Sequence, residues 1–211
     1  MSAPVHLYRP SATSSALDEE TARAELYGLL AQLFYAPPES ALWDALRVAV
    51  TEAPAPGAFL QEPWQQLVAT ARAMERSAVV AEFDRLFGGV GKPEVMLYAS
   101  HYLSGFLNEK PLVRLRDDLT RLGLGRDDQM PETEDHIAYL CEVMRYLIAG
   151  DDMEVCNLTV QREFYAAHLQ GWTPALCDAL QEHPAAHFYA ALARLAQAFF
   201  SVETQGFDLL D

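Results

Sequence analysis

The chain has 211 residues, of which 51% are apolar. This length allows one ordinary domain or two small ones, and this apolar content is too high for an intrinsically disordered protein. The 30 acidic residues outnumber the 15 lysines and arginines, which gives a formal net charge of −15. Such a chain repels phosphate backbones and anionic lipid, so nucleic acid and membrane surfaces are poor partners. A cationic peptide, a basic protein surface or a metal ion is favoured instead.

The cysteine content and the N-terminal region indicate a protein of the cytoplasm. Three cysteines, Cys141, Cys156 and Cys177, are present and no two have CxxC spacing, so a disulfide framework is not indicated. Residues 1–16 are rich in Ser, Ala and Pro and are predicted to form a flexible tail. This tail lacks the apolar core of a secretory signal, and the chain has no run of about 18 apolar residues that would span a membrane.

Helical periodicity dominates the N-terminal half of the chain. The first helix is predicted over 18–35, where leucines recur at helical spacing until Pro37 and Pro38 end it. Loop residues 51–57, with two prolines and a glycine, interrupt the next part. Five more helices are predicted in this half: 39–51, 63–75, 77–87, 99–108 and 111–122.

The C-terminal half begins with a polar loop at 123–132, which is the candidate hinge of the chain. Thr173 and Pro174 form an N-cap and first-turn pair that opens a helix. Helices are predicted over 133–149, 153–170, 173–182 and 185–202. No segment alternates as a strand does, so we expect an all-α fold: a compact bundle of about nine to eleven helices forming one domain over 17–211.

Two stretches resemble enzyme motifs but lack required positions. The glycines around Gly88 are followed by Lys92, but a phosphate-binding loop needs Ser or Thr where the chain has Pro93. His183 and His187 have the spacing of zinc ligands, yet a proline separates them and no third ligand is evident. The sequence therefore predicts no catalytic residues, no metal and no cofactor.

Negative charge is concentrated in residues 126–154, which contain nine acidic and two basic residues. Acids in a first helical turn stabilise the helix dipole by ~0.3–1 kcal/mol each, which is one explanation for Glu134 and Asp135. The other explanation is a binding site for cations, because carboxylates recognise arginine guanidinium groups with two parallel hydrogen bonds.

The helix predicted over 133–149 has a broad apolar face. Ile137, Cys141, Met144 and Ile148 form one stripe, and His136, Leu140, Val143 and Leu147 form the next. Asp135, Ala138, Glu142 and Arg145 form a more polar edge. Asp135 and His136 are therefore expected at the boundary between buried and exposed surface, where His136 serves either structure or binding.

Four short motifs in a fixed order resemble the TorD/DmsD/NarJ-type chaperones, which are maturation proteins for molybdenum-cofactor oxidoreductases. The motifs are Glu82-Phe83-Asp84-Arg85-Leu86-Phe87-Gly88, Tyr98-Ala99-Ser100-x-Tyr102, Glu134-Asp135-His136-Ile137-Ala138, and His168-Leu169-x-x-Trp172. The resemblance covers about residues 20–205. The chain departs from the family at Gly89–Glu94, where many relatives are proline-rich.

This resemblance implies a cytoplasmic, all-α, non-enzymatic chaperone that binds the twin-arginine signal peptide, or the body, of a molybdoenzyme catalytic subunit. It implies that export is delayed until the cofactor is inserted, and that the chaperone is a monomer or a domain-swapped dimer. Asp135 and His136 match the pair that the family uses for peptide binding, and Tyr98 and Ser100 belong to the same region.

A twin-arginine peptide is basic and then apolar, so its receptor needs carboxylates beside an apolar groove. We expect Glu134 and Asp135 to attract the arginines, and His136 to orient the loop or bond the peptide. The groove is expected from residues that would have to converge in space: Tyr98, Tyr102, Phe106, Leu140 and Trp172. A metal-dependent helical hydrolase, and a scaffold that bridges enzyme subunits, are the alternatives.

Overall fold

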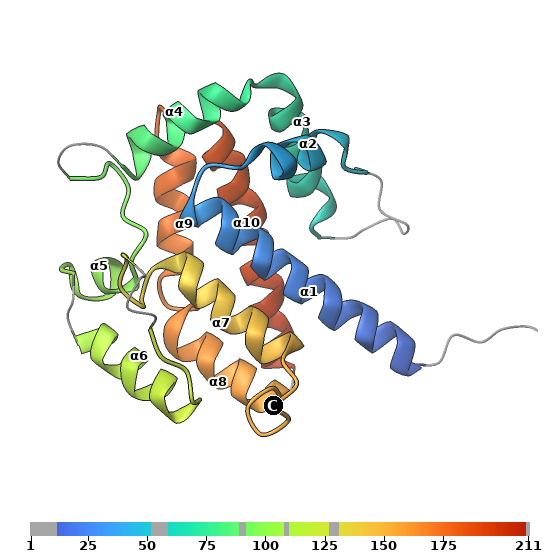
Figure 1. Cartoon of the computed structure of the whole chain (residues 1–211), viewed down its shortest axis with the longest axis vertical. Coiled ribbons are helices and arrows are strands. Elements are labelled where there is room, and N and C mark those ends of the chain that lie inside the picture. Colours follow the sequence, from blue (N-terminus) through green and yellow to red (C-terminus); the bar gives the residue numbers. More distant parts are fainter. Residues whose placement is uncertain (1–11, 52–58, 89–91, 108–109, 127–130, 210–211) are drawn as a thin grey trace, which may run out of the picture.

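The computed structural model describes residues 12–51, 59–88, 92–107, 110–126 and 131–209. Most of the predicted tail, Asp127 and Asp128 of the acidic segment, and the middle of the candidate hinge lie outside these ranges. The described residues form ten α-helices and no strand, which confirms the all-α fold (Figure 1). The helices are α1 (Ala12–Tyr35), α2 (Ser40–Val48), α3 (Gln61–Ala73), α4 (Arg76–Leu86), α5 (Ala99–Ser104), α6 (Lys110–Arg121), α7 (Ile137–Ala149), α8 (Leu158–His168), α9 (Thr173–Glu182) and α10 (Phe188–Asp208).

Each predicted helix is present, but several boundaries differ from the prediction. Helix α1 begins at Ala12, so residues 12–16 of the predicted flexible tail are helical, and α5 ends at Ser104 and not at 108. Helix α8 begins at Leu158 and not at 153, since the Asn157 side chain accepts a hydrogen bond from the Val160 amide. Helix α7 begins at Ile137 and not at 133, since the His136 side chain caps it. Helix α10 runs from Phe188 to Asp208, six residues beyond its predicted end.

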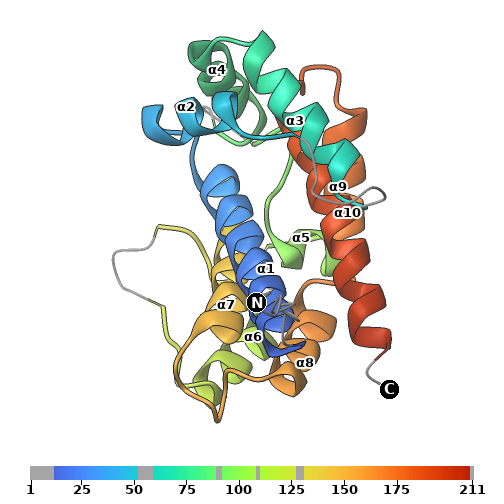
Figure 2. The ribbon, with the colours of Figure 1, turned by 90° about the vertical axis from the view of Figure 1, so that its right-hand side faces the viewer.

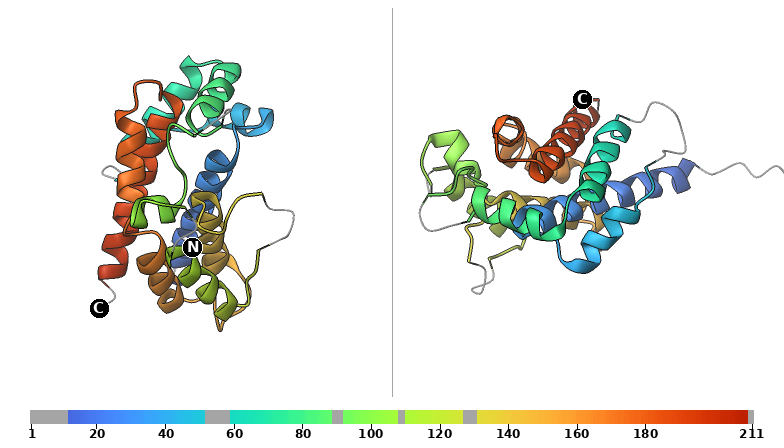
Figure 3. Two further views of the ribbon diagram at one scale, coloured as in Figure 1. Left: turned by 90° about the vertical axis from the view of Figure 1, so that its left-hand side faces the viewer. Right: turned by 90° about the horizontal axis from the view of Figure 1, so that it is seen from above.

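Two pairs of long helices enclose the core. Helix α1 lies against α7, and α10 lies against α9 and α3 (Figure 2). Figure 3 shows α9 and α10 on one side of the molecule and α1 with α7 on the other. Between them lie large, fully buried side chains such as Tyr27, Phe34, Phe188 and Phe199. Each such side chain contributes roughly 1.5–3 kcal/mol through burial. None of the described helices is long and apolar enough to cross a membrane.

A largely buried ion pair connects α1 with the C-terminal part of α10. The Arg23 guanidinium of α1 donates to both carboxylate oxygens of Glu203 on α10, at 2.7 and 2.8 Å. The Tyr27 hydroxyl donates to the same carboxylate at 2.9 Å, and Gln161 of α8 accepts from Arg23 at 3.2 Å. Because each polar group has a partner, this network joins three helices without leaving an unpaired charge.

The first helix turn of α10 is capped by a carboxylate from a distant helix. Glu82 of α4 is buried and accepts hydrogen bonds from the amides of His187, Phe188 and Tyr189, at 2.8, 3.2 and 2.8 Å. These amides have no partner within the helix, and the negative charge also offsets the helix dipole. Glu82 thus fixes α4 on the N-terminal end of α10.

We expect Glu82→Gln to lower the free energy of unfolding by about 2 kcal/mol, because an amide has one acceptor where the carboxylate has two and loses the charge. Urea denaturation followed by circular dichroism measures the change. Asp84→Asn is the matched control on the exposed side of α4 and should change stability by less than about 0.5 kcal/mol. Equal effects of the two substitutions would contradict the capping role.

Candidate functional site

The segments before α5 and α7 lie side by side and bring together four of the predicted site residues. The Ala99 amide donates to the Asp135 carbonyl at 3.0 Å, and the Ile137 amide donates to the Leu97 carbonyl at 2.8 Å. Tyr98 and His136 form an isolated antiparallel bridge between them. This junction therefore joins two pairs of residues that are far apart in the sequence: Tyr98 and Ser100 on one segment, and Asp135 and His136 on the other.

The Asp135 carboxylate is inside this junction and not on the surface. Only 1% of Asp135 is exposed. One carboxylate oxygen accepts from the Ser100 amide at 2.9 Å, and the other accepts from the Thr133 hydroxyl at 2.7 Å. In this structure the carboxylate is thus occupied by the start of α5, so it positions the site and does not face an approaching peptide.

His136 is the N-cap of α7 and is held as a neutral ring. Its Nδ1 accepts a hydrogen bond from the Ala138 amide at 3.2 Å, which requires that this nitrogen carry no proton. Burial lowers the pKa of His136 to about 4, although nearby Glu132 and Asp135 act in the opposite direction. The ring lies against the edges or faces of three tyrosines: Tyr35, Tyr98 and Tyr139.

Two carboxylates near the junction reach the surface, and both are paired. Glu134 accepts two hydrogen bonds from Arg116 of α6, from Nε at 3.0 Å and from Nη2 at 2.9 Å. Burial alone would raise the pKa of Glu134, but the hydrogen bonds and charge of Arg116 outweigh it and lower this pKa below its usual value. Glu132 accepts a hydrogen bond from the Tyr98 hydroxyl. Both acids lie on the segment that leads into α7.

Two hollows flank the outward face of α7. The first, of about 260 Å³, lies between α7 and the C-terminal end of α6, and the second, of about 310 Å³, lies between α7 and α1. Tyr139 and Glu142 line both, so we treat the two hollows together as the α7 groove. Its other lining residues are Ala31, Gln32, Tyr35, Leu119, Leu124, Gly125, Arg126, Glu134, Ala138, Val143 and Tyr146.

The α7 groove combines apolar and acidic side chains. Tyr35 is 46% exposed and Tyr146 36%, while Tyr139 and Val143 are half-buried between them. The carboxylates of Glu134 and Glu142 lie among these apolar groups. Aromatic rings offer both an apolar face and a surface for cations, so this lining suits a ligand that is partly apolar and partly basic.

The structure separates this groove from most residues that were expected to form one. Leu140 and Trp172 are fully buried, and Tyr102 stacks on Trp172 with ring centroids 5.5 Å apart. The Trp172 indole donates to the His168 carbonyl at 2.7 Å. Phe106 is 71% exposed, so these residues do not converge on one groove as the sequence predicted. Ala138, expected on the polar edge of α7, is buried.

Four groove residues were not predicted from the sequence: Tyr35, Leu124, Tyr139 and Tyr146. The pairing of Arg116 with Glu134 was not predicted either. Tyr139, Val143 and Tyr146 recur at intervals of three or four residues, which is a helical signal that was available. Tyr35 and Arg116 come from other helices, and no local pattern connects them with α7.

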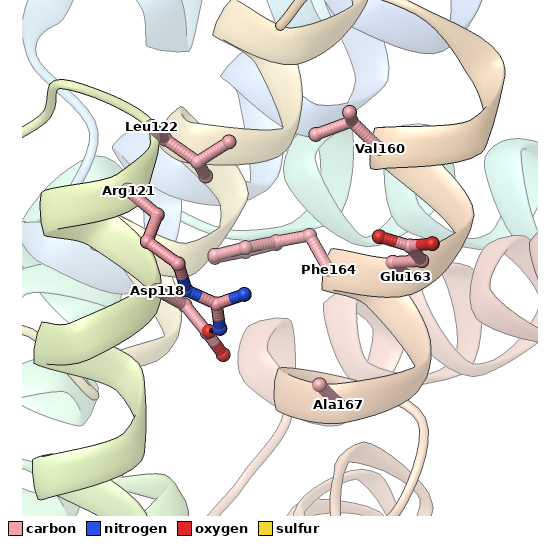
Figure 4. A pocket seen from close by; sticks show the side chains of 7 residues that line it. All are labelled: Asp118, Arg121, Leu122, Val160, Glu163, Phe164 and Ala167. Carbon is pink, nitrogen blue, oxygen red and sulfur yellow. Dashed lines mark ion pairs between the residues drawn. The ribbon is translucent and has the colours of Figure 1, made fainter.

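A third hollow lies between α6 and α8 (Figure 4). Asp118 and Arg121 of α6 form an ion pair there, facing Phe164 of α8. Asp118 also lies 2.6 Å from Nε2 of His168. An ionised carboxylate can only accept, so Nε2–H of His168 donates this hydrogen bond to Asp118. Burial, together with the charge of Arg121, lowers the pKa of His168 to about 4. This contact attaches α6 to α8.

The described residues offer no metal centre. They contain no group of three or more His, Cys, Asp or Glu side chains that could hold an ion. His183, one of the pair with zinc-like spacing, instead contacts Glu94 at 3.0 Å, and its Nδ1 accepts from the Ala185 amide. The metal-dependent hydrolase therefore has no support in this part of the chain.

Comparison with known proteins connects this geometry to one family. Residues 54–178 match the family model described as nitrate reductase delta subunit. A protein from Vibrio cholerae serotype O1 named chaperone protein TorD is 31% identical over 139 residues, which cover 63% of each chain. Proteins of the same name from Aliivibrio fischeri and Vibrio parahaemolyticus are 30% and 25% identical, over 59% and 60% of this chain and 62% of each relative. The chain thus matches less than two thirds of the length of these relatives.

The neutral His136 predicts a specific loss of stability in acid. Its pKa is near 4 in the folded protein and about 6.5 when unfolded, so the unfolded state binds more protons as the pH falls below 6.5. Between pH 7.5 and 5.5 this residue should cost about 1 kcal/mol of the free energy of unfolding. His136→Asn keeps an N-capping side chain and should reduce the pH dependence by that amount, as measured by urea denaturation at both pH values. Identical pH dependence in the two proteins would contradict a buried neutral ring.

Proposed function

Because the chain belongs to the nitrate reductase delta subunit family, we propose that it is a TorD-like chaperone of a molybdenum-cofactor oxidoreductase and not an enzyme. The family assignment is supported by a model match over more than half of the chain and by the similarity to TorD proteins. The single observation that carries the binding part of the proposal is the α7 groove, with its apolar lining and its carboxylates.

The proposed ligand is the twin-arginine signal peptide of the enzyme precursor. Such a peptide presents guanidinium groups followed by an apolar stretch. Glu134 and Glu142 line the groove and already bind guanidinium groups of the chain itself, those of Arg116 and Arg145. The arginines of the peptide would take the place of these internal partners, since carboxylates bind guanidinium through two parallel hydrogen bonds. Leu124, Val143 and Tyr146 provide the apolar surface for the following stretch.

The predicted site residues act at two levels in this proposal. Glu134 contacts the peptide directly. Asp135, His136 and Ser100 hold the segment that carries Glu134 against the start of α5, and Tyr98 holds Glu132. Leu140, Tyr102 and Trp172 support the same region from the core. Loss of Asp135 or His136 would therefore weaken binding through the position of the loop.

The charge of the chain supports the same ligand. A net charge of −15 attracts a basic peptide from a distance and speeds association at low salt. Burial of the apolar stretch then sets how long the complex lasts. A chaperone that holds the precursor in this way delays its export until the cofactor has been inserted.

Val143→Asn tests the apolar half of the groove. The half-buried Val143 side chain lines the groove, and an amide in its place loses apolar contact with the peptide. We expect the affinity for a synthetic twin-arginine signal peptide, measured by isothermal titration calorimetry, to fall by about tenfold, which corresponds to about 1.4 kcal/mol.

The matched control is Val113→Asn, the same change at an exposed position of α6 outside the groove. It should leave the affinity within about twofold of wild type. Equal losses from the two substitutions, or wild-type affinity that does not fall as salt rises from 50 to 500 mM, would overturn the proposed site, because paired surface charges are screened by salt (Debye length about 10 Å at 0.1 M).

A further inference from the structure

Glu134 already holds a guanidinium group that belongs to the chain itself. We propose that Arg116 is an internal competitor, which occupies the Glu134 carboxylate until an arginine of the bound peptide displaces it. This inference rests on the proposed function and deepens it, because it makes Arg116 a residue that sets affinity and selectivity.

Arg116 binds Glu134 with the same two-bond geometry that an arginine of a bound peptide would use. Nε and Nη2 of Arg116 each donate to a different oxygen of Glu134, at 3.0 and 2.9 Å. This parallel arrangement uses the planar fork of a guanidinium, which an ammonium group cannot match. The carboxylate is therefore oriented for an arginine from either source.

The two partners differ in how easily they can move. The Arg116 side chain is 49% exposed on α6, whereas the Glu134 side chain is 12% exposed. Glu134 is also the neighbour of Asp135, whose carboxylate and carbonyl are both bonded to the start of α5. Arg116 can thus rotate into solvent while Glu134 stays in the groove.

The charge of Glu134 is suited to such an exchange. Arg116 holds the pKa of Glu134 below its usual value, and the charge of Arg126 acts in the same direction. Glu134 is therefore ionised near neutral pH. An incoming guanidinium replaces Arg116 with no proton taken up or released, and the released Arg116 is solvated by water.

Exchange of one guanidinium for another gains little free energy at Glu134 itself. A peptide with arginines alone gains too little to displace Arg116, because the internal partner is always close by. A peptide that also buries an apolar stretch on α7 gains the additional free energy that the exchange requires. Arg116 would therefore select ligands that are basic and apolar over ligands that are only basic.

The chain offers a matched control for the charge change. Arg85 and Glu94 form a looser pair at 3.5 Å, with side chains 60% and 44% exposed, and neither residue lines the α7 groove. Arg116→Gln and Arg85→Gln both make the protein more negative by one charge. A difference between them therefore reports the local competition and not general attraction for a basic peptide.

The experiment is calorimetric titration of wild type, Arg116→Gln and Arg85→Gln with a twin-arginine signal peptide and with the same peptide carrying Ser and Gln in its apolar stretch. We expect Arg116→Gln to bind the full peptide about three- to tenfold more tightly than wild type. It should also show measurable affinity for the polar peptide. Arg85→Gln should stay within about twofold of wild type. In Glu134→Gln the further change Arg116→Gln should bring no gain.

An affinity of Arg116→Gln equal to or below that of wild type would overturn this inference and leave the proposed function standing. Absence of binding to either peptide by both wild type and Arg116→Gln would overturn the proposed function as well. Thermal unfolding checks that each variant is folded. If Arg116→Gln fails to fold, Arg116→Lys replaces it in the experiment. This variant retains the charge and the packing of the side chain but lacks the planar guanidinium, so its gain in peptide affinity over wild type should be smaller than that expected for Arg116→Gln.

Discussion

The bond between the buried Asp135 carboxylate and the Ser100 amide is the contact on which the candidate site depends. A buried carboxylate is costly unless each oxygen has a partner, and here Ser100 and Thr133 supply both. The two bonds fix the segment before α7 against the start of α5, and the backbone bonds at Leu97 and Ala99 continue the junction. This junction positions the two neighbours of Asp135. It places the Glu134 carboxylate in the α7 groove and the His136 imidazole inside the molecule.

The acidic residues of this chain have two different uses, which composition cannot separate. Glu82 and Glu203 are buried and join distant helices, the first by capping α10 and the second by binding Arg23. Asp118 similarly attaches α6 to α8 through His168. Glu134 and Glu142 instead line the α7 groove. The net charge of −15 thus overstates how much carboxylate is free to attract a partner.

Several motif residues that carry the family resemblance hold the fold, and need not touch a ligand to do so. Glu82 caps α10, His168 bonds to Asp118, and Trp172 bonds to the His168 carbonyl while it stacks on Tyr102. The groove lining is drawn mostly from residues outside the motifs.

The spacing of apolar residues and the positions of prolines, glycines and capping residues were enough to predict the ten helices, because these signals act within a few residues of each other. The outward stripe of Tyr139, Val143 and Tyr146 was also readable from spacing. What the sequence left open was decided by contacts between distant segments. The tertiary structure alone showed that Asp135 and His136 are buried. It also showed that Tyr35 of α1 lies against Tyr139 of α7, and that Arg116 of α6 forms an ion pair with Glu134. The physical reason is that a side chain's exposure and its charge partner depend on which helices meet, and no local pattern specifies that.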